Sequence, residues 1–546
     1  MSKETMIKTF TIGILLTTGA FAQMSYFPRP NYFRETFKNV NTRVELQPPS
    51  RLKDFVKDGK LELSLRDYLG LVMANNTGIQ IQYLTLERSR NSITSAYGAW
   101  DPTATFGIRP QSSTFDPKPN TPVADPSYGG STTRTWPLTF GFNQTLETGQ
   151  SISASASGTK TSADGGYPGF STGLGLSITQ PLLRNRGAYV NKIPLFEAQS
   201  SYKQAGFNLT STLLSLISNA ENVYWNAVSA RESVKVNKTA LDAAQSNWDF
   251  IQEQFKLGAI SYLDTYNPQE ALASAQLAYR QSVYNEQAAE DQARNQLAAD
   301  LDPDIRKLPL SLTEPVDLPE SETVVPDKEA EVQKALGLQP SLKAANQSLD
   351  IDDLSIASAE NGLKPTLNLS LGYSGAGAGG YYTNGFYSPA IIPGGLGDAL
   401  GQVFGLGSPT YYANLTLTLP LRNRSASVVL ANSLIQKRND TLTVRNTQQT
   451  IRLNILNAVV NLQNAIESVS LAKTQDDFSN LNLQAEVTKY KLGNEIQQNV
   501  VFAQQQLAQS DLTLLNAKIT LQKAVLSLYT QTGELLDKRG IIVKTP

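Results

Sequence analysis

The strongest pattern in the chain is a run of apolar residues whose spacings alternate between three and four. It covers residues 213–255, where only Asn237 is polar, and residues 503–528, where only Ser510 is polar. This spacing is typical of helices that pack along a coiled-coil seam, and the many alanines in it suit close packing. Long helices are predicted over residues 191–256 and 428–491. Each would be roughly 100 Å long at about 1.5 Å per residue, several times the thickness of a bilayer core.

A second pattern, of period two, predicts strands in two regions of the chain. Apolar residues alternate with small polar ones through much of residues 103–180, and again near both ends of residues 366–419. Each predicted strand therefore has one apolar face and one polar face of small side chains. A barrel with lipid outside and water inside needs this pattern, and a soluble β-sandwich has it too.

The connections between the predicted strands favour a barrel. A long loop is expected over residues 109–133, a tight turn at residues 147–150 and another long loop over residues 161–170. Long loops on one side and short turns on the other are typical of outer-membrane barrels. The glycine-rich stretch from Gly375 to Gly380 does not lead from a strand into a helix, so it is not a nucleotide fingerprint. It is expected to lie in a loop over residues 374–410.

The order of these elements occurs twice. Each copy runs helix, strands, long helix, glycine turn, helix, and the turns share an aromatic–Lys–Leu–Gly sequence that ends at Gly258 and Gly493. The strand exits at Pro181 and Pro420 are also alike. Such a duplication indicates two copies of one elongated unit. The expected segments are a signal peptide (1–22), an irregular segment (23–61), a first repeat (62–300, with its first helix over 62–97 and its last helix over 261–300), an equatorial linker (301–328), a second repeat (329–530, with its last helix over 496–530) and a tail (531–546).

The N-terminal segment predicts export from the cytoplasm, and the composition argues against the common enzyme classes. Residues 1–22 read as a secretory signal cleaved between Ala22 and Gln23. Beyond it there is no apolar run long enough for a membrane helix, so a membrane part must be a closed β-barrel. The 546 residues include no cysteine and no histidine, and the net charge is −1. Disulfides, Ser-His and Cys-His catalysis and attraction to nucleic acid are therefore not expected. Aspartate and glutamate are plentiful, so this composition still allows a two-carboxylate enzyme, but we predict neither enzymatic activity nor a cofactor.

Counting strands leads to an oligomer. One chain supplies four to six plausible membrane strands, whereas the smallest outer-membrane barrels need about eight. Open strand edges could not sit in lipid, so several copies must share one barrel. Because helices lead into and out of the strands, a shared barrel implies a shared ring of helices. The predicted fold class is thus mainly α with a membrane β-barrel, and the assembly is a conduit.

The duplicated helix–strand–strand–helix plan, the strand exit from Ser177 to Arg184 and the two aromatic–Lys–Leu–Gly turns resemble the TolC-type outer-membrane efflux factors over residues 62–535. The resemblance implies a homotrimer in the Gram-negative outer membrane, with a periplasmic helical tunnel. It implies a shared barrel of twelve strands, or eighteen if a surplus hairpin near residues 138–160 joins the wall. It also implies partners: a periplasmic adaptor and an inner-membrane pump, in a tripartite efflux or type I secretion system.

The resemblance further assigns roles to the two turns and to four acidic residues. The turns would be the periplasmic tips, which form the tunnel entrance and dock the adaptor. The tip residues are Phe255, Lys256, Leu257, Gly258 and Ala259 in the first copy, and Tyr490, Lys491, Leu492, Gly493 and Asn494 in the second. Candidates for an acidic ring that gates the entrance are Asp476, Asp477, Asp242 and Asp249. Leu263-Asp264 follows the first turn but Gln498-Asn499 the second, so the two tips are expected to differ in shape.

Two other classes of protein compete with an exit duct. A trimeric coiled-coil surface fibre, structural or adhesive, with a small β-domain would need neither paired helical turns nor a duplication. A self-sufficient porin would not need helices several times longer than a bilayer is thick. The exported cargo and the energy source of the pump stay open. The near absence of methionine, with no histidine or cysteine, argues against a relay of soft metal ligands.

Overall fold

The structure is a computed structural model, and every residue that it describes lies in one compact unit, residues 50–546. The described residues are 52–57, 59–115, 131–164, 168–297, 308–319, 324–380, 382–383, 391–392 and 394–543. The predicted signal peptide and its cleavage site at Ala22–Gln23 lie outside them, as do most of segment 23–61 and parts of linker 301–328 and loop 374–410.

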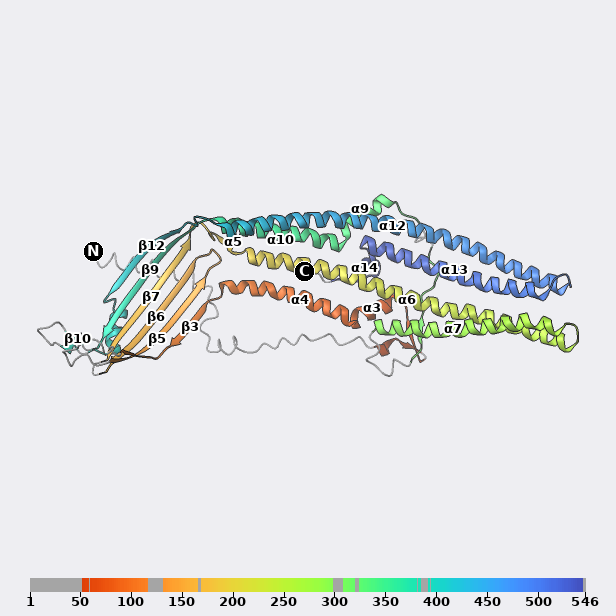
Figure 1. The fold of residues 1–546 in the computed structure, drawn as a ribbon, viewed down its shortest axis with the longest axis horizontal. Helices are drawn as coiled ribbons and strands as arrows, with labels where there is room; N and C mark the ends of the chain where they lie inside the picture. The colour runs from red at the N-terminus through yellow and green to blue at the C-terminus, as the bar shows by residue number, and fades with distance from the viewer. Residues whose placement is uncertain are drawn as a thin grey trace, which may run out of the picture. The chain divides into compact units, whose positions relative to one another are not determined.

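Two long helices carry the fold. α6 (Ile193–Lys256) has 64 residues and α12 (Arg424–Lys491) has 68, so they measure about 96 and 102 Å at about 1.5 Å per residue. Each is followed by a return helix, α7 (Tyr266–Gln296) after α6 and α13 (Gln497–Thr532) after α12, and the pairs lie antiparallel (Figure 1). The predicted coiled-coil seam is present, with Leu213, Ala220 and Ala227 of α6 buried. No described helix is both long and apolar enough to cross a membrane.

The first helix of each repeat is broken in the middle, which corrects the prediction of one helix over residues 62–97. Asn76 ends one helix and caps the next, because its side chain accepts hydrogen bonds from the amides of Gly78 and Ile79. In the second repeat the break falls at Gln339, directly before Pro340. The helices are α3 (Leu65–Asn75) and α4 (Thr77–Tyr97) in the first repeat, and α9 (Lys328–Leu338) and α10 (Pro340–Leu363) in the second. The short helices are η1 (Leu52–Phe55), η2 (Gly98–Trp100), α5 (Ala188–Asn191), η3 (Tyr262–Thr265) and α14 (Leu535–Lys538).

The described residues form one seven-stranded antiparallel sheet from both repeats. Its strands follow the order β12-β9-β7-β6-β5-β3, and β4 also pairs with β5 (Figure 1). The strands are β3 (Thr103–Ile108), β4 (Gln111–Phe115), β5 (Ser131–Thr145), β6 (Ser151–Ala163), β7 (Gly169–Pro181), β9 (Thr366–Gly379) and β12 (Pro409–Thr418). The expected loops are shorter than predicted, because β4 and the start of β5 occupy parts of residues 109–133 and the strands β6 and β7 extend into residues 161–170.

The glycine-rich stretch of the second repeat is a strand rather than a loop. β9 continues to Gly379, paired with β7, and α11 (Leu396–Phe404) packs on its end. A Cβ on Gly377 would collide with the carbonyl oxygen of Ala399, and one on Gly379 with that of Gly395. Glycine here therefore lets a helix backbone lie directly on the strand. Two further short strands within residues 374–410 pair with each other, β10 (Tyr382–Thr383) and β11 (Ile391–Ile392).

The main core lies half-way along the helices. Tyr68, Tyr224 and Trp225 are almost fully buried there. The ring centroids of Tyr68 and Tyr224 are 5.3 Å apart, and those of Tyr224 and Trp225 are 5.6 Å apart. A small sheet covers this core, formed by β1 (Val56–Lys57), β2 (Lys60–Leu63) and β8 (Leu310–Leu312). β2 and β8 pair in parallel, so the predicted irregular linker contains a strand and the predicted helix 62–97 is preceded by one. This small sheet joins the start of the first repeat to the linker between the repeats.

Candidate functional site

The two predicted tips are closed by the same backbone turn. In the first, the amide of Gly258 donates to the carbonyl of Phe255 at 2.9 Å, and that of Ala259 to Gln254 at 2.9 Å. In the second, Gly493 donates to Tyr490 at 2.9 Å and Asn494 to Lys489 at 3.0 Å. The glycines have φ of +71° and +75°, a left-handed conformation that costs other residues about 1 kcal/mol or more. The repeated sequence thus encodes a repeated helix C-cap.

The tips differ beyond the glycine, as the sequence predicted. In the first, Ser261 and Asp264 form a capping box and open the single turn of η3 before α7 begins. In the second, α13 begins at Gln497 without such a box. Both tips nevertheless expose large apolar side chains. Leu257 is 82% exposed and Leu492 is 70% exposed, and Leu263 and Ile496 beside them are also exposed.

The two hairpins contact each other just above the tips, where the predicted tip residue Tyr490 meets partners that sequence reasoning missed. The Tyr490 hydroxyl donates to Oε1 of Gln254 at 3.2 Å, and the Tyr490 ring meets Phe250 edge-on with centroids 6.3 Å apart. The Gln497 amide also donates to Oδ1 of Asn247. Because these partners come from different repeats, their contacts set the distance between the hairpins at this end of the helices. The aromatic residue of the repeated turn was the only signal available in the sequence.

Three of the four acidic candidates, Asp242, Asp476 and Asp477, lie at about the same height above the tips, and Asp249 lies closer to its tip. Asp249 precedes Phe255 by about 9 Å and Asp242 by about 20 Å, at about 1.5 Å per residue. Their carboxylates bind residues of their own helix: Asp242 pairs with Lys238 at 2.7 Å, and Asp249 accepts from Gln245 at 2.9 Å. Asp476 lies about 21 Å before Tyr490, and Asp477 beside it is exposed.

Asp476 faces its own hairpin partner. Its Oδ1 accepts a hydrogen bond from the Ser510 hydroxyl at 3.0 Å, and Ser510 is fully buried on α13. The adjacent Asp511 also faces Asp476. Burial, followed by its hydrogen bond to Asp476 and the charge of Asp476, raises the pKa of Asp511 to about 6. The one polar residue in the predicted α13 seam therefore marks a carboxyl pair between α12 and α13.

This pair predicts that the α12–α13 hairpin weakens as the pH rises. The pKa of Asp511 is higher in the folded protein than in the unfolded chain. Its carboxyl group therefore contributes stability that is fully present below about pH 4 and is lost as the pH rises through about 6. After allowance for solvent screening, the loss is on the order of 1 kcal/mol. Asp511→Asn should therefore raise the melting temperature at pH 7.5 more than at pH 4.5, measured by circular dichroism. Asp477→Asn, at the exposed neighbour of Asp476, is the control and should change neither value.

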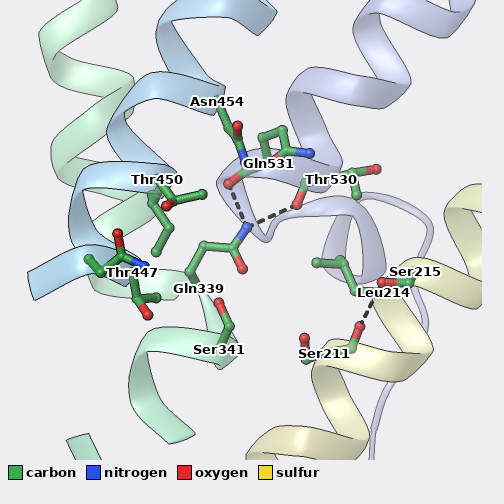
Figure 2. Close-up of a pocket in the computed structure, with 12 residues that line it drawn as sticks. Ser211, Leu214, Ser215, Gln339, Ser341, Thr447, Thr450, Asn454, Thr530 and Gln531 are labelled. Carbon is green, nitrogen blue, oxygen red and sulfur yellow. Dashed lines mark hydrogen bonds between the residues drawn. The ribbon is translucent and has the colours of Figure 1, made fainter. Parts of the chain in front are cut away.

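A polar hollow of about 270 Å³ lies where the two repeats meet. Its lining residues carry hydroxyl and amide groups, with only two aliphatic side chains, and no carboxylate or cationic group is among them. Gln339 crosses this region and donates to the carbonyls of Thr530 and Gln531 at 3.1 and 2.6 Å (Figure 2). The hollow thus lies between the α9–α10 break and the end of α13. Its lining residues include no group suited to acid–base or metal chemistry.

Comparison with known proteins identifies the second repeat. Residues 332–534 match the family described as outer membrane efflux protein. No curated protein matches the chain. Similar solved structures include CusC (15% identity, 89% of this chain and 97% of that chain, TM-score 0.60) and CmeC of Campylobacter jejuni (16%, 88% and 87%, 0.59). MtrE of Neisseria gonorrhoeae is also similar (15%, 86% and 89%, 0.57). The last two are described as outer membrane channels.

At these identities the solved structures establish the fold, and the family match covers the repeat that contains α9 to α13. The first repeat has the same plan in the same fold, with the same aromatic–Lys–Leu–Gly turn. Residues 332–534 therefore belong to the outer membrane efflux protein family, whose members are Gram-negative outer-membrane channels that extend into the periplasm, and the chain as a whole has the fold of such channels.

Proposed function

We propose that three copies of this chain form the exit duct of a tripartite efflux or type I secretion system. The duct is passive, and an inner-membrane pump supplies the energy through a periplasmic adaptor. One observation carries this proposal: among the residues that the structure describes, the sheet has an open edge at β3 and another at β12, beside two long helical hairpins. Backbone groups at an open edge cannot sit in lipid, so the edges must pair with identical neighbours. A surface fibre has no need of two hairpins with equivalent tips and is not favoured.

Oligomeric state and conductance test this function. The purified protein in mild detergent should have the mass of a trimer. In planar bilayers it should form discrete channels that are closed most of the time, because its tips are held together. A monodisperse monomer, or a trimer without channel activity even after the tip contacts are removed, would contradict the proposal.

The exposed leucines of the tips are proposed to dock the adaptor. Apolar side chains at the end of a periplasmic helical bundle favour burial against a partner, whereas a buried charge without a partner is strongly unfavourable. Leu257→Glu together with Leu492→Glu should lower the yield of the co-expressed adaptor that purifies with the protein by at least about tenfold, because two carboxylates enter the interface. The trimer itself should persist.

Leu277→Glu provides the matched control for this docking prediction. Leu277 is 71% exposed on α7 and lies away from both turns, so adaptor recovery should be unchanged in this variant. Equal loss in the control and the tip variant would mean that the tips have no particular part in docking.

A further inference from the structure

The surplus hairpin of the first repeat is part of the sheet wall. β5 and β6 lie between β3 and β7, and both are fully paired (Figure 1). β3 and β4 pair with successive parts of β5 and so occupy one position at the edge. Each chain thus contributes six strand positions in one unbroken sheet.

The two faces of the wall continue through the hairpin without interruption. Residues that pair directly across antiparallel strands share a face. One such row, from β3 to β12, is wholly apolar or aromatic: Ala104, Phe142, Ala154, Leu176, Tyr373 and Tyr411. The adjacent row on the opposite face is small and polar: Thr105, Gly141, Ser155, Gly175, Ser374 and Thr410. The hairpin therefore has the same apolar and polar faces as the strands on either side.

The turn of the hairpin is fixed to the helical region. Glu147 forms an ion pair with Lys192 at 2.5 Å, and the carbonyl of Thr148 accepts from the amide of Gly187 at 3.3 Å. At Gly149, φ is +84° and a Cβ would collide with the carbonyl of Asn185. The turn therefore packs closely on the chain that leads from β7 into α6, at the level where the other strands join their helices.

We propose that the trimer closes a wall of eighteen strand positions, six from each copy, with β12 of one copy paired to β3 of the next. This inference rests on the proposed trimeric duct. Six is an even number of antiparallel positions, so β12 and β3 run in opposite directions and can pair antiparallel around the ring. Closure satisfies the backbone groups of both edges, which lipid could not do.

A wall of eighteen strand positions has about the same radius as the ring of helices. With strands about 4.8 Å apart and tilted by about 40°, the wall radius is about 18 Å, against about 12 Å for twelve strands. Four helices from each copy, twelve in all, placed about 9.5 Å apart also form a ring with a radius of about 18 Å. The wall thus continues the helical tunnel without tapering, and the limit on cargo size is set at the periplasmic tips.

A spin label on the β5–β6 hairpin distinguishes a hairpin that is part of the barrel wall from one that lies outside the wall. The chain has no cysteine, so Phe140→Cys and Thr139→Cys each create a single labelling site, one on each face of β5. In the full-length trimer in lipid vesicles, a label at position 140 should be accessible to oxygen and protected from a water-soluble nickel chelate. The label at position 139 should show the reverse. A label at position 140 that is open to the nickel chelate would place the hairpin outside the wall and overturn the inference.

Electron microscopy of the same trimer supplies the second test. The barrel should have a backbone diameter of about 36 Å, and deletion of residues 131–164 should reduce it to about 24 Å. A full-length barrel of about 24 Å would overturn the inference even if the deletion variant did not fold. In that case a trimer with channel activity would still support the duct, whereas absence of any trimer would contradict the proposed function itself.

Discussion

Arg539→Met is expected to destabilise the protein by about 3–5 kcal/mol, the range found when one partner of a buried ion pair is removed. Arg539 follows α14, and its guanidinium donates to both carboxylate oxygens of Glu221 on α6, with Nε to Oε2 at 2.9 Å. Glu221 is fully buried and also accepts from Nε1 of Trp225 at 3.4 Å. Without the guanidinium, the ionised carboxylate would stay in the main core at a high cost.

Thermal unfolding followed by circular dichroism would measure this loss. The informative control is the double variant Arg539→Met with Glu221→Gln, because replacing both charges removes the uncompensated carboxylate. It should recover most of the stability lost in the single variant. If the double variant were as unstable as the single one, packing of the arginine stem, and not its charge, would account for the effect.

Tyr490→Phe is expected to shift the channel toward its open state by about a hundredfold. The substitution removes the hydrogen bond from Tyr490 to Gln254 but keeps the ring against Phe250. A hydrogen bond of this kind contributes about 1 kcal/mol, and three copies in the proposed trimer give about 3 kcal/mol. If these bonds exist only while the tips are together, the ratio of open to closed channels rises by about two orders of magnitude.

Single-channel recording in planar bilayers would measure the change as open probability. Tyr284→Phe is the matched control, because Tyr284 is 65% exposed on α7 and lies away from both turns. The control should behave like the unaltered protein. Equal open probability in Tyr490→Phe and the unaltered protein would show that contacts between the hairpins do not hold the entrance closed.

The repeated elements could be predicted because their signals are local. The spacing of three and four in α6 and α13, and the glycine at each turn, depend only on residues close in sequence. The strands around Phe140 and Leu176 were visible for the same reason, through their alternation. The duplication then supplied the architecture that leads to the family.

The features that were missed depend on residues far apart in the chain. The strand from Ser374 to Gly379 has no apolar alternation, and its place in the sheet is set by pairing with β7. β8 has only three residues and is a strand because it pairs with β2. At the site, the hydrogen bond from Tyr490 to Gln254 joins residues separated by 236 positions, and no periodic pattern in the sequence indicates it. The roles of the tip residues and of the four acidic candidates remain predictions.

The open edge of the sheet has a consequence for biogenesis. All ten residues of β12 are exposed in the single chain, and the apolar residues Leu415 and Leu417 are among them. Before assembly, each newly exported chain therefore presents the open edge of an apolar strand to the aqueous periplasm, and such an edge is a template for aggregation. We expect a periplasmic chaperone to shield this edge until the other two chains of the proposed trimer pair with it, so loss of such a chaperone should deplete this protein before it affects barrels built from one chain.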